Sequence, residues 1–199
     1  MMPPMASAQE DVPRHPIQVR FEDERAVVSA EARHLVDRAL RSRIESGLPQ
    51  TIVTRVYAYR NGRSEPIALG LRSCRITYDP WRLDYRVRIQ TTDVDHSMVA
   101  HTLDQVITSC ISIHDLSVGR PDDWRASRGS QVWFAVLIEH NPLSPETVQR
   151  IRRWLARPDG PNAGSDAFFG SFVSLFVNRQ IGEAERIFRF RSPEEVLYP

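Results

Sequence analysis

The length and composition of this chain describe one ordinary globular domain. It has 199 residues, of which 41% are hydrophobic and 26% are charged, enough to bury a sizeable core. The formal net charge is only +1, so no long-range field attracts nucleic acid, and we expect no nucleic-acid partner. All 26 basic residues are arginine, which excludes Schiff-base, P-loop and other enzymes that depend on a lysine amine. No stretch approaches the roughly 18–20 apolar residues that span a bilayer, so we expect no transmembrane segment.

The first 16 residues predict a disordered tail, because they contain four prolines and several charges. Within this tail, Ala6-Ser7-Ala8 before Gln9 has the small-residue spacing that signal peptidases cleave. The charged and apolar regions of a signal peptide do not precede that site. Two interpretations therefore stay open: a start codon assigned too late in a periplasmic protein, or a chance alanine-rich tail in a cytoplasmic one.

Two strands and a helix are expected next. Apolar and polar residues alternate over 17–21, as in a half-buried strand, and a short strand follows over 26–28. From 30 to about 46 apolar residues recur at helical spacing, which predicts an amphipathic helix. Ser29 is the expected N-cap of this helix, and Gly47 is its expected end.

The middle of the chain predicts an antiparallel meander. Residues 51–60 are rich in β-branched and aromatic side chains, and Asn61-Gly62 is the best hairpin signal, returning through 67–77. A turn at 78–81 leads to a strand over 82–90. In that strand the apolar residues alternate strictly with charged ones, Leu83, Tyr85, Val87 and Ile89 with Arg82, Asp84, Arg86 and Arg88. The strand should therefore have one wet, arginine-rich face.

Helices and strands are mixed in the second half. A second helix is expected over about 95–113, and a long polar loop over 114–130. The apolar run 132–138 is typical of a central strand covered on both sides. Ser144-Pro145 starts a further helix that ends before residue 158.

The C-terminal part begins with a Pro/Gly/Asn linker over 158–165. A Phe-rich helix over 167–177 and a last strand over 187–190 follow it. Strands and helices are mixed without strict β-α-β alternation. We therefore predict an α+β fold, with a mainly antiparallel sheet of about six or seven strands and three or four packed helices. The expected organisation is a disordered tail, an α+β core, and a linker, Phe-rich helix and strand packed on the same domain, at 1–16, 17–157 and 158–199.

The two cysteines admit two states. Cys74 lies on a predicted strand and Cys110 on the inner face of a predicted helix, so a disulfide joining helix to sheet is geometrically reasonable. A disulfide would close the loop between the two cysteines and stabilise the fold by about 3 to 4 kcal/mol. The alternative is two buried thiols in the cytosol. Cys110 and His114 also suggest a thiolate with a nearby base, but Cys110 falls on the apolar stripe and no third orienting group is evident.

Three sets of residues are candidates for binding. Arg82, Arg86 and Arg88, with Arg72 and Arg75 nearby, could grip a carboxylate or phosphate; the alternative is a wet face with internal ion pairs. Trp124 in the long loop could anchor a protein partner, or lie on the core as a cover. Phe168 and Phe172 could dock a protein partner, or belong to the core.

No catalytic, metal or cofactor site is expected. Gly-x-Ser-x-Gly, P-loop and Gly-x-Gly-x-x-Gly motifs are absent from the sequence. His101 and Asp104 are three apart among other acidic and histidine residues, but no recognised zinc spacing is present, and a solvated helix start explains the same residues.

Several motifs resemble an uncharacterised bacterial family of small proteins of about 200 residues, a domain of unknown function that is usually exported. The motifs are Gly47-Leu48-Pro49, Arg55-Val56-Tyr57-Ala58-Tyr59 and Arg75-Ile76-Thr77-Tyr78. The later helix at 103–113 and the strand at 132–138 follow in the same order, so the resemblance covers about 17–157. It implies export and no catalytic residues.

The function expected from the sequence is that of a non-enzymatic cell-envelope protein that binds another protein. The alternative is a cytosolic enzyme or small-molecule binder that uses the arginine-rich sheet face for an anionic ligand.

Overall fold

The computed structural model describes residues 12–142, 184–193 and 195–199. The described residues form mainly strands, with short helices between some of them. The strands are β1 (Gln18–Glu22), β2 (Arg25–Ala30), β3 (Gln50–Arg60), β4 (Pro66–Asp79), β5 (Asp84–Thr91), β6 (Asp95–Ala100), β7 (Ile113–Val118), β8 (Gln131–Pro142), β9 (Ala184–Arg191) and β10 (Val196–Leu197). The helices are the 3-10 turn η1 (Arg33–Leu35), α1 (Arg38–Ile44), α2 (Leu103–Cys110) and α3 (Pro121–Arg125).

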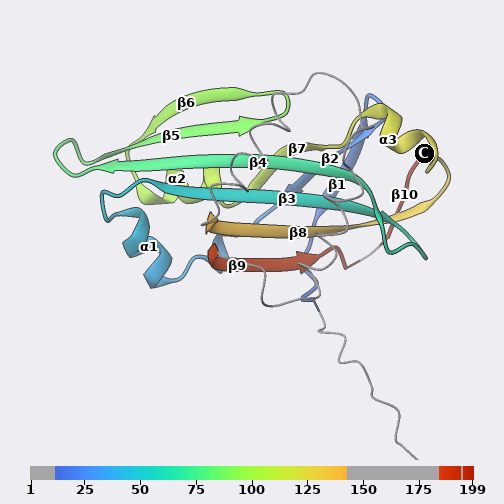
Figure 1. Ribbon diagram of the computed structural model, residues 1–199, viewed down its shortest axis with the longest axis horizontal. Helices are drawn as coiled ribbons and strands as arrows, with labels where there is room; N and C mark the ends of the chain where they lie inside the picture. Colours follow the sequence, from blue (N-terminus) through green and yellow to red (C-terminus); the bar gives the residue numbers. More distant parts are fainter. Residues whose placement is uncertain (1–11, 143–183, 194) are drawn as a thin grey trace, which may run out of the picture.

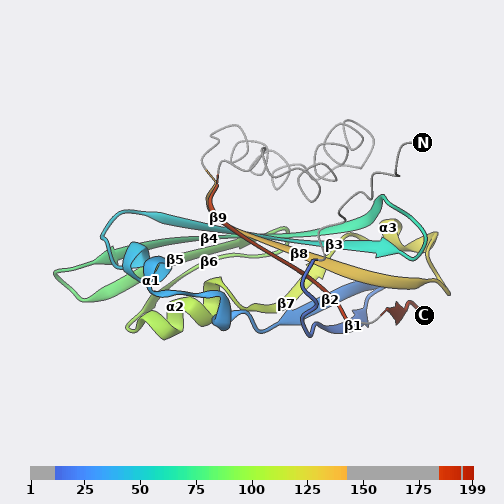
Figure 2. The ribbon, with the colours of Figure 1, turned by 90° about the horizontal axis from the view of Figure 1, so that it is seen from below.

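The strands form two antiparallel sheets. Seven strands make the large sheet in the order β10-β8-β3-β4-β5-β6, with β9 also paired to β8, and the small sheet has the order β1-β2-β7 (Figure 1). Seen from below, α1, α2 and the small sheet lie on the same side of the large sheet (Figure 2). The predicted α+β class with a mainly antiparallel sheet is therefore confirmed, while the helices of the described part are shorter than expected.

The main core lies between the large sheet and the layer beneath it. Alternate residues of β3, among them Ile52 and Val56, point into this core and meet Val28 of β2 and Ile107 of α2. The residues between them point to the other face of the sheet, where Tyr57 is also fully buried. β3 is therefore buried on both faces of the sheet, which agrees with its mostly hydrophobic sequence.

The central strand predicted at 132–138 is confirmed as β8. It pairs with β3 on one side and with β9 and β10 on the other, and its residues 134–138 are all buried. The predicted C-terminal strand is β9. At the end of the predicted N-terminal tail, the His15 amide donates to the Arg191 carbonyl at 2.9 Å, so this part of the tail lies against β9.

The first predicted helix is wrong in its start and length. β2 continues to Ala30, and the α-helix begins only after Asp37, whose carboxylate accepts a hydrogen bond from the Leu40 amide at 2.8 Å. Ser29 does not cap a helix, because its hydroxyl is bonded to Asp115 of β7. Pairing between β2 and β7 outweighs the local capping preference of Ser29.

The second predicted helix begins too early. Residues 95–100 form β6, which pairs with β5, and the helix starts after Thr102. Thr102 and Gln105 form a reciprocal capping box, with the Thr102 hydroxyl accepting from the Gln105 amide at 3.2 Å. An ion pair between Arg88 and Asp95 holds the start of β6 against β5, so tertiary pairing overrides the helical spacing.

The long polar loop predicted at 114–130 is also wrong. It contains most of β7, which completes the small sheet, and the single turn of α3. The helices expected at 144–157 and 167–177 lie outside the described residues.

Candidate binding surface

A disulfide joins Cys74 of β4 to Cys110 of α2, with the two Cα atoms 5.5 Å apart. The disulfide, one of the two states that the sequence left open for the cysteines, is therefore present in the structure. It ties the end of α2 to the middle of the large sheet on the covered face. Because Cys110 is bonded, it cannot serve as the thiolate considered with His114, whose ring instead bonds to the Thr108 carbonyl at 3.2 Å.

Arg72 lies beside this disulfide and not on the exposed arginine face. Its guanidinium is buried and donates to the carbonyls of Cys110 at 3.0 Å and Ser112 at 2.7 Å. Burial lowers the pKa of Arg72 to about 10, so it stays charged at neutral pH. The cation therefore satisfies carbonyl groups at the end of α2, where the helix dipole is negative.

The arginine face predicted on β5 exists, but its members are placed differently. Arg86 and Arg88 are exposed on β5, and Arg75 of β4 lies directly opposite Arg88. Arg82 belongs to the turn before β5, and Asp84 is buried at the start of the strand. The face therefore consists of Arg75, Arg86 and Arg88, which we call the arginine cluster.

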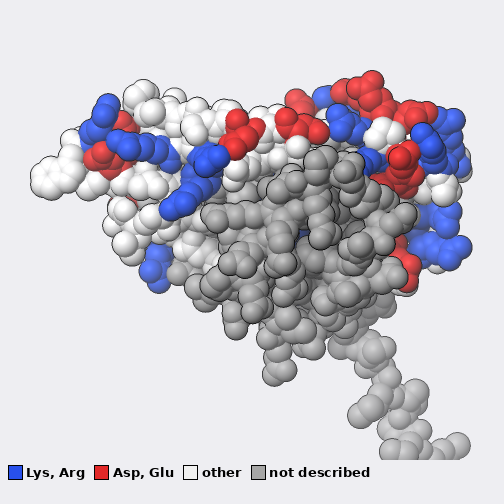
Figure 3. All heavy atoms as spheres, turned by 45° about the horizontal axis from the view of Figure 1, so that its top comes forward, with Lys and Arg blue, Asp and Glu red and all other residues white. Residues whose placement is uncertain are grey.

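Acidic neighbours satisfy most of these cations. Arg88 binds both oxygens of Asp95, at 2.9 and 2.7 Å, and this pairing lowers the pKa of Asp95 to about 2. Arg86 lies 3.9 Å from Asp79. Figure 3 accordingly shows blue and red side chains interspersed on this view of the surface rather than one patch of a single sign. Internal ion pairing, the alternative left open by the sequence, accounts for much of the cluster.

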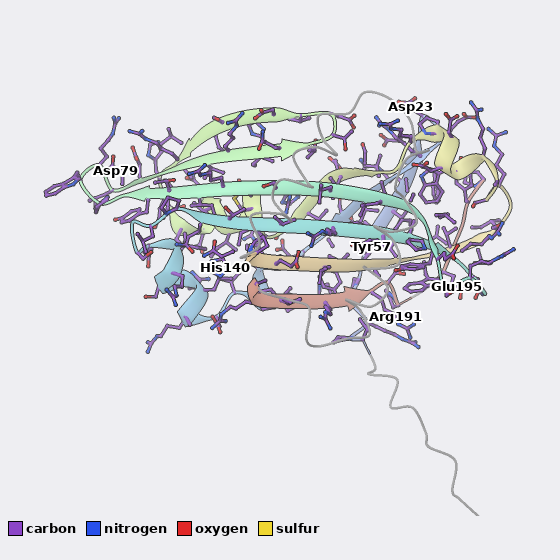
Figure 4. All side chains as sticks on the ribbon, viewed as in Figure 1. Asp23, Tyr57, Asp79, His140, Arg191 and Glu195 are labelled. Atoms are coloured by element: carbon purple, nitrogen blue, oxygen red, sulfur yellow. A yellow bond between two sulfur atoms is a disulfide. The ribbon has the colours of Figure 1, made fainter. Side chains whose placement is uncertain are left out.

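The most unusual surface is the turn between β4 and β5. Trp81 is 93% exposed and Leu83 is 67% exposed. The turn is well ordered, because the Asp79 carboxylate accepts hydrogen bonds from the amides of Trp81 at 3.0 Å and Arg82 at 3.2 Å. Leu83 closes it with a φ of +54°. Figure 4 shows Asp79 at the far end of the sheet from Glu195.

The base of this hairpin is braced against the rest of the fold. Tyr78 and Tyr85 face each other across β4 and β5 with their ring centroids 4.8 Å apart. The Tyr85 hydroxyl donates to Glu45 at the end of α1, at 3.2 Å. Burial and the adjacent Glu45 raise the pKa of Tyr85 to about 12, which keeps this donor protonated.

A third exposed apolar side chain lies at the same end of the sheet. Leu48 is 63% exposed in the connection between α1 and β3, just before the point where Gln50 pairs with Ile76. We call Trp81 and Leu83, together with Leu48 at the same end of the sheet, the apolar tip. They are half of the exposed large hydrophobic residues among those described, the others being Val94, Val99 and Leu197. The sequence predicted only a turn at 78–81 and did not predict this exposed surface. The available signal was a tryptophan at the tip of a hairpin.

Of the two alternatives that the sequence left open for Trp124, an anchor for a partner or a cover on the core, the structure shows the cover. Trp124 is fully buried, and its indole N–H donates to the Val118 carbonyl at 2.8 Å. Its ring packs against Phe21 and Tyr198, so it covers the core. Phe168 and Phe172, the other candidates for partner binding, lie outside the described residues.

A buried ion pair on β3 and β8 was not predicted from the sequence. Arg55 of β3 and Glu139 of β8 are paired and buried on the second face of the large sheet. Burial lowers the pKa of Arg55. A charged residue within each of two otherwise apolar runs was the signal for this pair.

Across 12–142 and the two C-terminal stretches, no group of three or more metal-ligating side chains is gathered. Within the same part of the chain, no helix has the length and apolar character to cross a membrane.

Comparison with known proteins identifies no relative: no family model matches the chain, and neither does any curated protein or solved structure. The resemblance to an exported bacterial family therefore stays a prediction.

Replacing both cysteines by alanine should lower the free energy of unfolding by about 3 to 4 kcal/mol, because the disulfide closes a loop with a separation of 36 residues. Urea unfolding of the oxidised protein, the reduced protein and the Cys74→Ala/Cys110→Ala variant measures this. The reduced wild type should unfold near the double variant. Equal midpoints for oxidised and fully reduced wild type would contradict a stabilising bond.

The ion pair between Asp95 and Arg88 should give the fold an acid-sensitive contribution. Because the folded-state pKa of Asp95 is depressed to about 2, this contribution is complete above the ordinary carboxyl pKa and is lost as the pH falls toward 2. Carboxyl NMR titration should find the low pKa in the wild type and a return toward the ordinary value in Arg88→Gln. An ordinary pKa in the wild type would show that the pair does not form in solution.

Proposed function

We propose that this chain is a non-enzymatic protein-binding domain of the cell envelope, and that it binds its partner through the apolar tip. The observation that carries the proposal is the almost complete exposure of Trp81 at the end of a hairpin. Leaving a tryptophan in water forfeits a large hydrophobic gain, and aromatic residues of this kind are enriched among the residues that dominate protein interfaces.

The hairpin holds the backbone at Trp81 in a fixed position. The Asp79 carboxylate orders the turn, and Tyr85 ties the base of the hairpin to α1 through Glu45. A surface that is already ordered loses little conformational entropy when it binds. Leu83 in the same turn and Leu48 at the same end of the sheet would extend the contact around the tryptophan, with Arg82 at its polar border.

The cell envelope is supported by the disulfide. Bonds of this kind form and persist in oxidising compartments and are rare in the cytosol. The bond between Cys74 and Cys110 therefore favours the periplasmic interpretation of Ala6-Ser7-Ala8 over the chance alanine-rich tail.

A photo-crosslinking residue in place of Trp81 tests the proposed function in the native cell. We expect a discrete protein adduct that is absent when the same residue replaces Leu197, which is 59% exposed on β10. A Leu83→Asp change should weaken the adduct, because it puts a charge into the apolar tip. Trp81→Ala should leave the thermal midpoint unchanged, since the side chain has few contacts to lose. Identical adduct patterns at 81 and 197 would refute the tip as a specific surface.

A second candidate function is binding of a small anion at the arginine cluster. Arg75 has no ion pair among the described residues and stands directly opposite Arg88, and like charges in that arrangement are destabilising. A phosphate or carboxylate bound by Arg75 and by Arg86, which lies diagonally across from it, would offset the positive charge that Arg75 places opposite Arg88.

Thermal shift assays with phosphate and citrate distinguish this second candidate from the first. If it holds, both anions raise the midpoint of the wild type, and Arg75→Gln and Arg86→Gln each reduce the rise. Arg120→Gln, an exposed arginine on the connection before α3, is the matched control and should keep it. An equal rise in all of these proteins would indicate a general salt effect.

A further inference from the structure

The strand β6 forms an open edge of the large sheet. It pairs with β5 on one side only and is the outermost strand in Figure 1. Four of its six residues are exposed over 95–97 and at 99. No described residue is hydrogen-bonded to its outer side.

The backbone groups that point outward can be identified from the hairpin that joins β5 to β6. The Thr91 amide donates to the Val94 carbonyl at 2.7 Å, so this pair is hydrogen-bonded. Bonded and non-bonded pairs alternate along an antiparallel ladder, and the pairing of β6 with β5 has no shift in register. The residues whose N–H and C=O groups point away from β5 are therefore Asp95, Ser97 and Val99.

The usual protections of a sheet edge are missing from β6. It contains no proline, lysine or bulge. Its one acidic side chain, Asp95, is held back toward β5 by Arg88. An edge of this kind accepts another strand readily.

We propose that β6 pairs antiparallel with β6 of a second copy of this chain, about a two-fold axis that passes through Ser97. The outward groups are arranged symmetrically around Ser97, with Asp95 two residues before it and Val99 two residues after it. In this register Ser97 faces Ser97 of the second copy, and Asp95 faces Val99. Each of these pairs exchanges both backbone hydrogen bonds.

The side chains of this register are compatible with each other. Ser97 is small, His96 faces Met98 of the second copy, and no like charges are brought opposite. Val94, which is 49% exposed, comes to lie beside Ala100 of the second copy. The axis is perpendicular to the sheet, so the covered faces of both copies stay on one side and the two large sheets become continuous.

The dimer should be weak, because a single pair of six-residue strands buries less than the roughly 1,200–2,000 Å² of stable protein interfaces. The two-fold axis turns the hairpins between β4 and β5 of the two copies toward opposite ends of the extended sheet, so both copies of Trp81 stay exposed.

Sedimentation velocity of the full-length oxidised protein tests the proposal from low micromolar to submillimolar concentrations. The wild type should show a sedimentation coefficient that rises with concentration toward that of a dimer. Ser97→Pro should stay monomeric, because it removes an outward N–H while leaving the bonds between β5 and β6 intact. Ser97→Ala keeps the amide and should behave as the wild type does.

A cysteine variant tests the register independently of proline. Under mild oxidation Ser97→Cys should form a covalent dimer, whereas Thr92→Cys in the exposed turn before β6 should form much less. Ser97→Glu, which places two carboxylates opposite each other, should dissociate the dimer even if Ser97→Pro fails to fold. A wild type that sediments as a monomer throughout, or equal crosslinking at 92 and 97, would overturn the proposal. Neither outcome bears on binding at the apolar tip.

Discussion

The covalent tie between Cys74 and Cys110 is the constraint on which the arrangement of this fold depends. It fixes α2 beneath the large sheet at the middle of β4, the longest strand. Arg72, two residues earlier on the same face, donates to carbonyls at the end of that helix. Arg72 has no carboxylate partner among the described residues, and the two carbonyl dipoles offset the cost of burying its charge. The bond and the cation therefore hold β4 firmly against the core.

Because β4 is anchored in this way, its far end can extend beyond the layer that covers the sheet. The same strand that carries Cys74 ends at Asp79, where the hairpin turns and exposes Trp81. On the opposite face of β4, Arg75 lies in the arginine cluster. The alternation of a β-strand thus separates a stabilising face from a surface face, and the turn beyond Asp79 stays exposed.

The sequence predicted those elements whose local pattern agrees with their tertiary pairing. Strict alternation over 82–90 and the Asn61-Gly62 turn both lead to the observed meander. The prediction of a helix over 95–113 was wrong in its first part, because residues 95–100 pair with β5 as β6. Only the residues after Thr102 form the helix that the spacing predicts. The candidate site was harder to predict, because sequence cannot tell whether a tryptophan lies on the core or in water. Trp124 and Trp81 both follow acidic or turn-forming residues, yet one is buried and the other exposed.

The two surfaces left open by the fold lie on different boundaries of the same sheet. The apolar tip is at the end of β4 and β5, beyond Asp79, whereas the open edge runs along the side of β6. A partner at the tip therefore need not block the edge, and pairing at the edge need not cover the tip. If both are used, two tips point in opposite directions along one continuous sheet. Such a dimer could hold two partner molecules apart, and it could engage two sites on one partner only if that partner spanned the length of the sheet.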